Sequence, residues 1–129
     1  MIKLENNWKQ KTLENLEKHE WLSFDSDSRL LKRIKVLRKL PLEDFTIEDL
    51  RLMIGQNESL NYLIPLALEK LEENILAEGD FYKGDLLLSV VNSRAEFWEN
   101  SIDLKNKLVD MIMKNKQKIE DEDINITLD

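Results

Sequence analysis

The sequence predicts an all-α fold, a single compact domain of about six helices, and three observations support this. The 129 residues include only 3 Gly and 2 Pro, far fewer turn residues than an assembly of short strands needs. Hydrophobic residues account for 42% and charged residues for 35% of the chain, a balance typical of a globular protein. Apolar residues also recur at helical spacing along most of its length.

Two helices are predicted in the first forty residues. The first covers about residues 12–20. The second is basic, begins after a cap at Ser28 or Asp27 and runs through Lys39. Its apolar side is expected to face inward and consists of Leu30, Leu31, Ile34 and Leu37.

The clearest helix start lies at residues 45–50. Thr46 is a good N-cap, and Asp49 stands three residues later, where it can complete a variant of the capping box. Phe45 and Leu50 are spaced as a hydrophobic staple, and Gly55 is a suitable C-terminal stop. We therefore expect a helix over residues 46–55.

The next segment has the longest apolar stripe in the chain. It follows the i, i+3, i+4, i+7 rule through Leu60, Leu63, Ile64, Ala67, Leu68 and Leu71. Pro65 interrupts the pattern, so a separate or kinked first turn is expected. Three carboxylates, Glu69, Glu72 and Glu73, occupy the opposite face.

Three further helix starts follow. Asp85 is expected to cap a short, apolar and central helix over residues 86–91. Ser93 and Glu96 match a capping box before Phe97 and Trp98. Ser101 is expected to cap the final long helix, whose core stripe is Leu104, Leu108, Met111 and Ile112. The domain core is thus expected over residues 10–117, with a frayed acidic tail over 118–129.

The charge is segregated along the chain. Residues 1–40 hold 10 Lys/Arg against 6 Asp/Glu, residues 41–103 hold 4 against 14, and residues 104–129 hold 5 against 6, for a net charge of −7. An acidic field of this kind steers basic partners, whereas phosphate binding requires a positive surface. The alternative interpretation is that the acidity only aids solubility.

Candidates for catalysis and for metal binding are weak. The chain has no Cys, and its single His is His19, so Cys-based and multi-histidine metal sites are excluded. Glu78, Asp80 and Asp85 share a loop with two glycines, but their spacing does not match an EF-hand, and turn formation is the favoured interpretation. Paired carboxylates such as Glu69 and Glu73 have no nucleophile or cofactor loop beside them. We expect no enzymatic activity and no cofactor.

Nucleic-acid and membrane binding are also disfavoured. Lys32, Arg33, Lys35 and Lys39 make the basic helix the one nucleic-acid candidate, but no aromatic platform is interleaved with them. A solvated helix face, or pairing with the acidic middle of the chain, is the favoured interpretation. No apolar stretch approaches the roughly 20 residues that span a bilayer. The polar N-terminus does not match a signal peptide, so a cytoplasmic location is expected.

Three segments stand out along the chain, residues 49–56 (DLRLMIGQ), 62–69 (YLIPLALE) and 74–87 (NILAEGDFYKGDLL). Together they resemble one family, the immunity proteins of bacterial contact-dependent growth inhibition systems. Residues 12–17 and the Phe97–Trp98 pair are also similar, so the resemblance covers about residues 12–110. The family often has proline at the positions of Ile75 and Lys83, and the loss of both is expected to loosen the loop.

The resemblance implies a non-catalytic cytoplasmic protein that binds and blocks the toxic C-terminal domain of a contact-dependent effector. Many such toxins are nucleases, so the expected partner is a basic protein domain rather than nucleic acid, membrane or a small molecule. A helical adaptor that binds another basic protein is the alternative. The toxin-binding residues that we expect are Glu69, Glu72, Glu73, Glu78, Asp80, Asp85 and, as an aromatic anchor, Tyr82.

Overall fold

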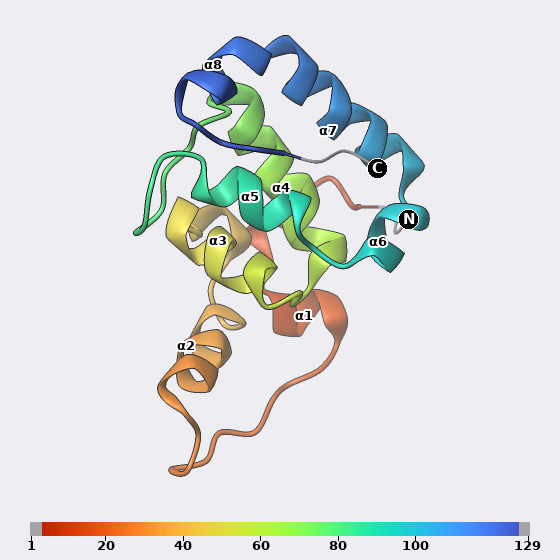
Figure 1. Cartoon of the computed structure of the whole chain (residues 1–129). Coiled ribbons are helices and arrows are strands. Elements are labelled where there is room, and N and C mark those ends of the chain that lie inside the picture. Colours follow the sequence, from red (N-terminus) through yellow and green to blue (C-terminus); the bar gives the residue numbers. More distant parts are fainter. Residues whose placement is uncertain (1–3, 127–129) are drawn as a thin grey trace. The chain divides into compact units, whose positions relative to one another are not determined.

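The computed structural model describes residues 4–126, and every regular element in that range is helical. The all-α prediction is confirmed, although eight α-helices are present instead of about six. The elements are η1 (Trp8–Gln10), α1 (Leu13–Glu17), α2 (Arg29–Leu37), η2 (Leu42–Asp44), α3 (Ile47–Gly55), α4 (Leu60–Glu73), α5 (Asp85–Val91), α6 (Ala95–Glu99), α7 (Ile102–Lys114) and α8 (Lys116–Asp121). Figure 1 shows them in chain order. No helix in this range is long and apolar enough to span a membrane.

The chain packs as two units that divide between Phe45 and Thr46. The expected single domain, with its core over residues 10–117, stays a prediction.

The N-terminal unit contains α1 and α2, joined by a long irregular connection (Figure 1). Thr12 caps α1 and Ser28 caps α2, each side chain accepting a hydrogen bond from the backbone three residues on. Of the two caps predicted for α2, Ser28 or Asp27, the structure selects Ser28. The first helix is shorter than expected and ends at Glu17, because Lys18 adopts a left-handed conformation with φ 53°.

The apolar side of α2 is only partly as predicted. Ile34 and Leu37 are buried and Leu31 is half-buried, but Leu30 is 39% exposed. Lys35 is instead buried, because its ammonium group binds the Asp27 carboxylate at 2.6 Å and also donates to the Leu22 carbonyl. Lys35 was expected on a solvated helix face or paired with the acidic middle of the chain, and it is instead a buried cation with two oxygen partners in the N-terminal unit.

The C-terminal unit is built around α3, α4 and α5, which contact one another. The predicted capping box is confirmed at the start of α3, where Asp49 N donates to Thr46 Oγ1 at 3.1 Å and Thr46 N donates to the Asp49 carboxylate at 3.0 Å. The helix ends at Gly55 as expected, although the left-handed residue that turns the chain is Asn57, with φ 56°.

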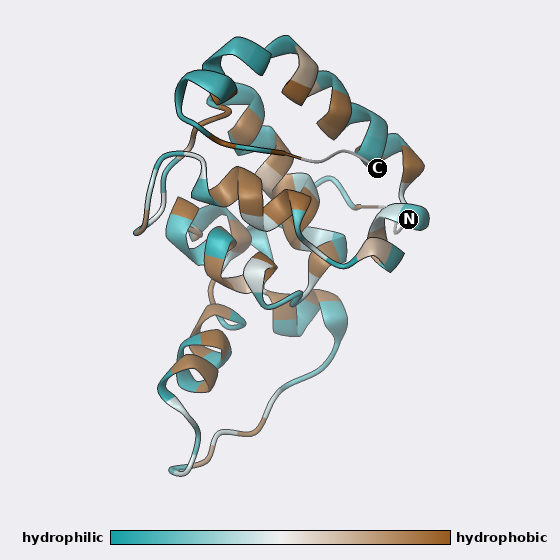
Figure 2. Cartoon of the chain, in the orientation of Figure 1, coloured by the Kyte–Doolittle hydropathy of each residue, from teal (hydrophilic) through white to brown (hydrophobic). Residues whose placement is uncertain are grey.

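The long stripe of α4 is buried as predicted, from Leu60 to Leu71. Pro65 does not divide the helix, because it lies near the N-terminal end and removes only the hydrogen bond to Asn61, an exposed residue. The short helix α5 is central, with Leu86, Leu87 and Val90 fully buried. Figure 2 shows its apolar character along most of its length.

The predicted capping box at residues 93–96 is wrong. The Ser93 hydroxyl donates to the Val90 carbonyl at 2.6 Å and accepts from Trp98 Nε1 at 2.9 Å, so it is not available to cap α6. Trp98 and Phe97 are buried and meet edge to face, with ring centroids 5.0 Å apart. The hydroxyl therefore accepts the hydrogen bond of the buried indole N–H instead of one from a backbone amide at the exposed start of α6.

The last helices cover α4. α7 contacts α4, α6 and α8, and buries Leu108, Met111 and Ile112, whereas Leu104 is half-buried. Ser101 stands at the N-cap position of α7, but its side chain makes no capping hydrogen bond. The expected frayed tail is wrong for residues 118–121, which belong to α8 and include the buried Ile119. Residues 127–129 of that tail lie outside the described residues.

Candidate protein-binding site

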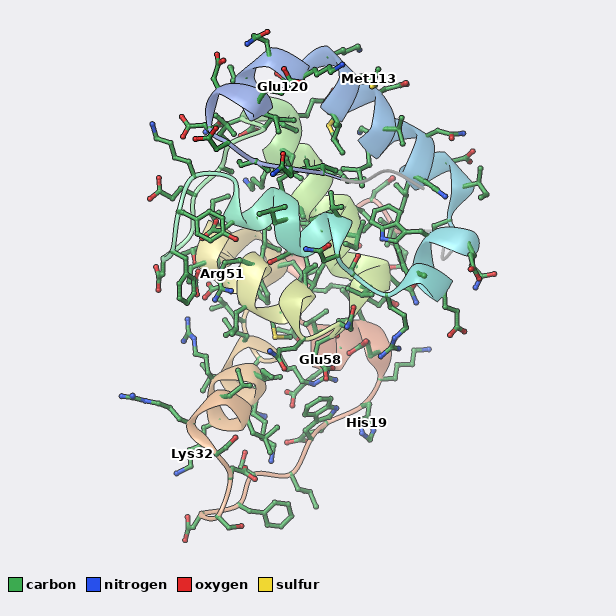
Figure 3. The ribbon with its side chains drawn as sticks, viewed as in Figure 1. His19, Lys32, Arg51, Glu58, Met113 and Glu120 are labelled. Carbon is green, nitrogen blue, oxygen red and sulfur yellow. The ribbon has the colours of Figure 1, made fainter. Side chains whose placement is uncertain are left out.

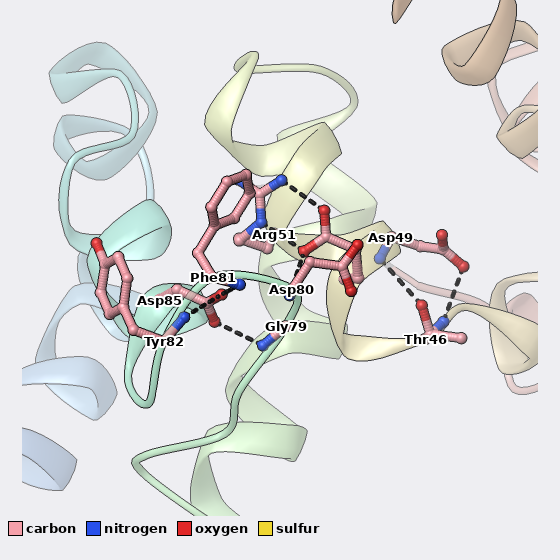
Figure 4. A network of polar contacts seen from close by, with 9 residues as sticks. Thr46, Asp49, Arg51, Gly79, Asp80, Phe81, Tyr82 and Asp85 are labelled. Carbon is pink, nitrogen blue, oxygen red and sulfur yellow. Dashed lines mark hydrogen bonds and ion pairs between the residues drawn. The ribbon is translucent and has the colours of Figure 1, made fainter.

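The loop between α4 and α5 is held by a buried carboxylate. Asp85 accepts hydrogen bonds from three backbone amides of the loop, those of Gly79 at 2.7 Å, Phe81 at 3.1 Å and Tyr82 at 3.4 Å (Figure 4). Asp85 is only 3% exposed. It is the first residue of α5 and Gly84 is the N-cap, so the predicted capping role of Asp85 is wrong. Its carboxylate fixes the preceding loop instead.

A second carboxylate, Glu48 on α3, holds the same loop from the other side. One of its oxygens accepts from Asp80 N at 2.9 Å, and its two oxygens bind Arg51 through Nε and Nη2, each at 2.6 Å. The hydrogen bonds from Arg51 lower the pKa of Glu48 below its usual value, and burial only partly opposes this. Four successive loop amides, from Gly79 to Tyr82, are thus bound by two carboxylates.

The two loop glycines are required for different reasons. Gly84 has φ +87°, a left-handed conformation that favours glycine. Gly79 allows a close approach to α3, since a Cβ atom there would lie 2.5 Å from Glu48 Oε1 and 3.3 Å from Glu48 Cα. The sequence predicted backbone freedom at both glycines, whereas the close approach of Gly79 depends on the tertiary structure.

The loop presents two aromatic side chains to solvent. Phe81 is 66% exposed and Tyr82 is 51% exposed. The Arg51 guanidinium lies 4.3 Å from the centroid of the Phe81 ring (Figure 4), a cation–π contact that orients the ring. Nonpolar groups that remain exposed on an ordered loop are typical of a protein-binding surface.

Two shallow hollows flank this loop. The first, of about 340 Å³, is lined mainly by the loop, α3 and α5: Arg51, Ile54, Gly55, Phe81, Tyr82, Asp85, Leu88, Ser89 and Asn92. The second, of about 560 Å³, is lined by Glu78, Tyr82, Lys83, Leu88, Glu122, Asp123, Ile124 and Asn125. Tyr82 and Leu88 belong to both hollows, so Tyr82 stands between them.

The seven predicted toxin-binding residues fall into two groups. Glu69, Glu72 and Glu73 lie on α4, and the other four lie in the loop or at its end. Glu72 and Glu73 are exposed, with Glu72 3.4 Å from the Lys107 ammonium, and Glu69 is half-buried. Glu78, Asp80 and Tyr82 are exposed. Asp85 is buried, so it can affect a partner only by holding the loop in place.

Sequence reasoning missed Phe81, Glu48 and Arg51. The pair Glu48 and Arg51, three residues apart on one helix, is a pattern that indicates an ion pair. Its contact with Asp80, 32 residues away, has no sequence signal. The adjacent aromatics at 81 and 82 between two Gly-Asp pairs were the available signal for the exposed loop.

The remaining sequence candidates are the metal ligands, His19 and the basic helix. No group of three or more His, Asp and Glu residues in the range 4–126 is arranged to hold a metal ion. His19 is exposed and, like Lys32, extends outward from the chain (Figure 3). On the basic helix and just after it, Lys35 binds Asp27, while Lys39 lies 3.1 Å from Glu14. These partners lie in the N-terminal unit and not in the acidic middle of the chain.

The comparison with protein families identifies the family of this chain. A family model for immunity proteins of contact-dependent growth inhibition (CDI) matches residues 15–108, which is well over half of the chain. Searches of curated proteins and of solved structures found no match. The match includes α2 to α6 and the whole of the loop between α4 and α5. The resemblance noted in the sequence is therefore confirmed, and the chain belongs to the family of CDI immunity proteins.

Proposed function

We propose that this chain binds and neutralises the C-terminal toxin domain of a contact-dependent effector, and that this toxin is a nuclease. In this proposal the chain acts in the cytoplasm as an inhibitor, without catalysis or a cofactor of its own. It covers the toxin's active site or a surface beside it, and it does not bind nucleic acid, membrane or a small-molecule substrate directly.

The observation that carries this proposal is the concentration of acidic residues in one unit. Residues 46–129 hold 18 Asp/Glu against 9 Lys/Arg. A nuclease needs a positive surface to bind phosphates, and an acidic protein can occupy that surface. Complementary charge also accelerates encounter, which suits an inhibitor that must bind before the toxin causes damage.

We assign the toxin contact to the exposed members of the predicted set. On α4 these are Glu72 and Glu73, with the half-buried Glu69 beside them. On the loop they are Glu78, Asp80 and Tyr82. Asp85 contributes by holding the loop amides, as described above.

The first experiment is co-expression with the toxin C-terminal region encoded immediately upstream, followed by pull-down and a growth assay. Growth rescue together with a stable complex is the expected result. A chain that neither binds nor rescues contradicts the proposal and favours the adaptor alternative.

The second experiment tests the α4 face by charge reversal. The triple variant Glu69→Lys, Glu72→Lys and Glu73→Lys should fold and weaken toxin binding on the order of 100-fold, because like charges across an interface cost several kcal/mol. The matched control, Glu99→Lys, Asp110→Lys and Glu120→Lys, makes the same change in net charge at exposed positions of the same unit. Equal affinity losses in both triple variants would contradict the α4 face as an interface.

A further inference from the structure

We propose that Tyr82 is the aromatic wall of a cation-binding subsite, and that the side chain seated there is a lysine or arginine from the surface of the toxin. This inference rests on the proposed function, because it assumes a toxin partner. It adds the chemistry of one contact and the residue that recognises it.

The loop between α4 and α5 exposes an unusual amount of aromatic surface. In the range 4–126, eight large hydrophobic side chains are exposed, and Phe81 and Tyr82 are the one pair adjacent in sequence. Aromatic side chains are enriched among residues that dominate binding energy, because they bury a large area at a low cost in conformational entropy. This pair is therefore the strongest anchor candidate on the described surface.

The loop is already ordered before any partner binds. Asp85 and Glu48 accept the four amide hydrogens of residues 79–82. A loop held in this way loses little conformational freedom on binding, so more of the contact energy is available for affinity. The backbone beneath Tyr82 is thus organised by groups that are themselves buried or half-buried.

The hollow beside Tyr82 combines apolar and acidic residues. Tyr82 and the apolar Leu88 and Ile124 line the larger hollow, together with the acidic residues Glu78, Glu122 and Asp123. Lys83, the one cation of this lining, lies 3.9 Å from Glu122, which leaves the lining with an excess of negative charge. An aliphatic stem can lie against the apolar residues while its charged end meets the carboxylates.

The same loop already binds one cation, Arg51, through its other aromatic residue, Phe81. Arg51 lies over the Phe81 ring, whereas no cation of the described chain lies over Tyr82. The face of a tyrosine ring attracts lysine and arginine through its quadrupole. A basic toxin supplies the missing cation.

The test uses the full-length chain and the toxin C-terminal domain encoded immediately upstream, with affinity measured by calorimetry. Tyr82→Phe keeps the ring and should bind within about twofold of wild type. Tyr82→Leu keeps an apolar side chain without a ring, and should bind about 5- to 30-fold more weakly, the range expected for a partly desolvated cation–π contact. The control is Phe24→Leu, at an aromatic residue that is 58% exposed in the N-terminal unit, and it should bind as wild type does.

A double-mutant cycle then tests the cation directly. Glu78→Gln should weaken binding in the wild-type background and should weaken it less in the Tyr82→Leu background, because both residues contact the same charged group. Equal affinities for Tyr82→Leu and wild type, or strictly additive losses in the cycle, overturn the inference. If the wild-type chain itself does not bind the toxin, the proposed function fails, and this inference fails with it.

Discussion

Removal of the Asp85 carboxylate tests whether the loop is held as described. Asp85→Ala deletes the acceptor of two well-formed hydrogen bonds, at 2.7 Å and 3.1 Å, and of a longer one at 3.4 Å. A hydrogen bond to a charged acceptor contributes about 1.5–3 kcal/mol, so the two short bonds would contribute about 3–6 kcal/mol. Water can reach part of the freed backbone, because Phe81 and Tyr82 are exposed. We therefore expect the free energy of unfolding to fall by about 2–4 kcal/mol.

Urea unfolding monitored by tryptophan fluorescence measures this loss, since the buried Trp98 reports on the same unit. The control is Asp80→Ala on the same loop. Asp80 is exposed and its backbone amide, not its carboxylate, binds Glu48. Its replacement should therefore change the free energy of unfolding by less than about 0.5 kcal/mol. A loss below about 1 kcal/mol for Asp85→Ala, or equal losses for both variants, would refute the view that Asp85 holds the loop.

Two further predictions concern buried and half-buried polar groups. Ser93→Ala leaves the indole N–H of the buried Trp98 without its acceptor and should lower the free energy of unfolding by about 1–3 kcal/mol in the same urea assay; a neutral effect would show that the indole finds another acceptor. Arg51 lowers the pKa of Glu48 from its ordinary value of 4.5, so the stability that this carboxylate adds is complete above that pH and is lost as the pH falls through the lower folded-state pKa. The stability difference between wild type and Glu48→Gln should thus be constant from pH 7 to about pH 5 and should shrink in more acidic solution; a difference that does not change with pH would contradict the role of the ionised carboxylate.

Local sequence patterns were sufficient at the start of α3 and along the buried face of α4. Thr46 and Asp49 are three residues apart, so the capping box forms within one turn and can be recognised without any knowledge of the rest of the fold. The stripe of α4 was equally clear, because helical spacing places its apolar residues on one face. The family resemblance was also recognised from local patterns, since it depends on ordered motifs along residues 12–110.

Predictions failed where one side chain had two possible partners. Ser93 has the spacing of an N-cap, but the buried indole of Trp98 is the more costly group to leave without a hydrogen bond. Lys35 was expected on a solvated helix face, and it is buried because Asp27 and the Leu22 carbonyl are within reach. Sequence spacing identifies which partners a hydroxyl or an ammonium group can reach, but it does not show which of these hydrogen bonds is the more stable.

The sequence by itself determined the all-α class, the cap at Thr46, the buried face of α4 and the concentration of acidic residues. Only the tertiary structure decided the form of the candidate binding loop, because that form depends on Glu48 meeting a backbone amide 32 residues away and on Asp85 turning back toward three amides. Helical periodicity is a property of neighbours within a few residues. The contact between a carboxylate and a loop far along the chain depends on how the helices pack. No local sequence pattern indicates such a contact.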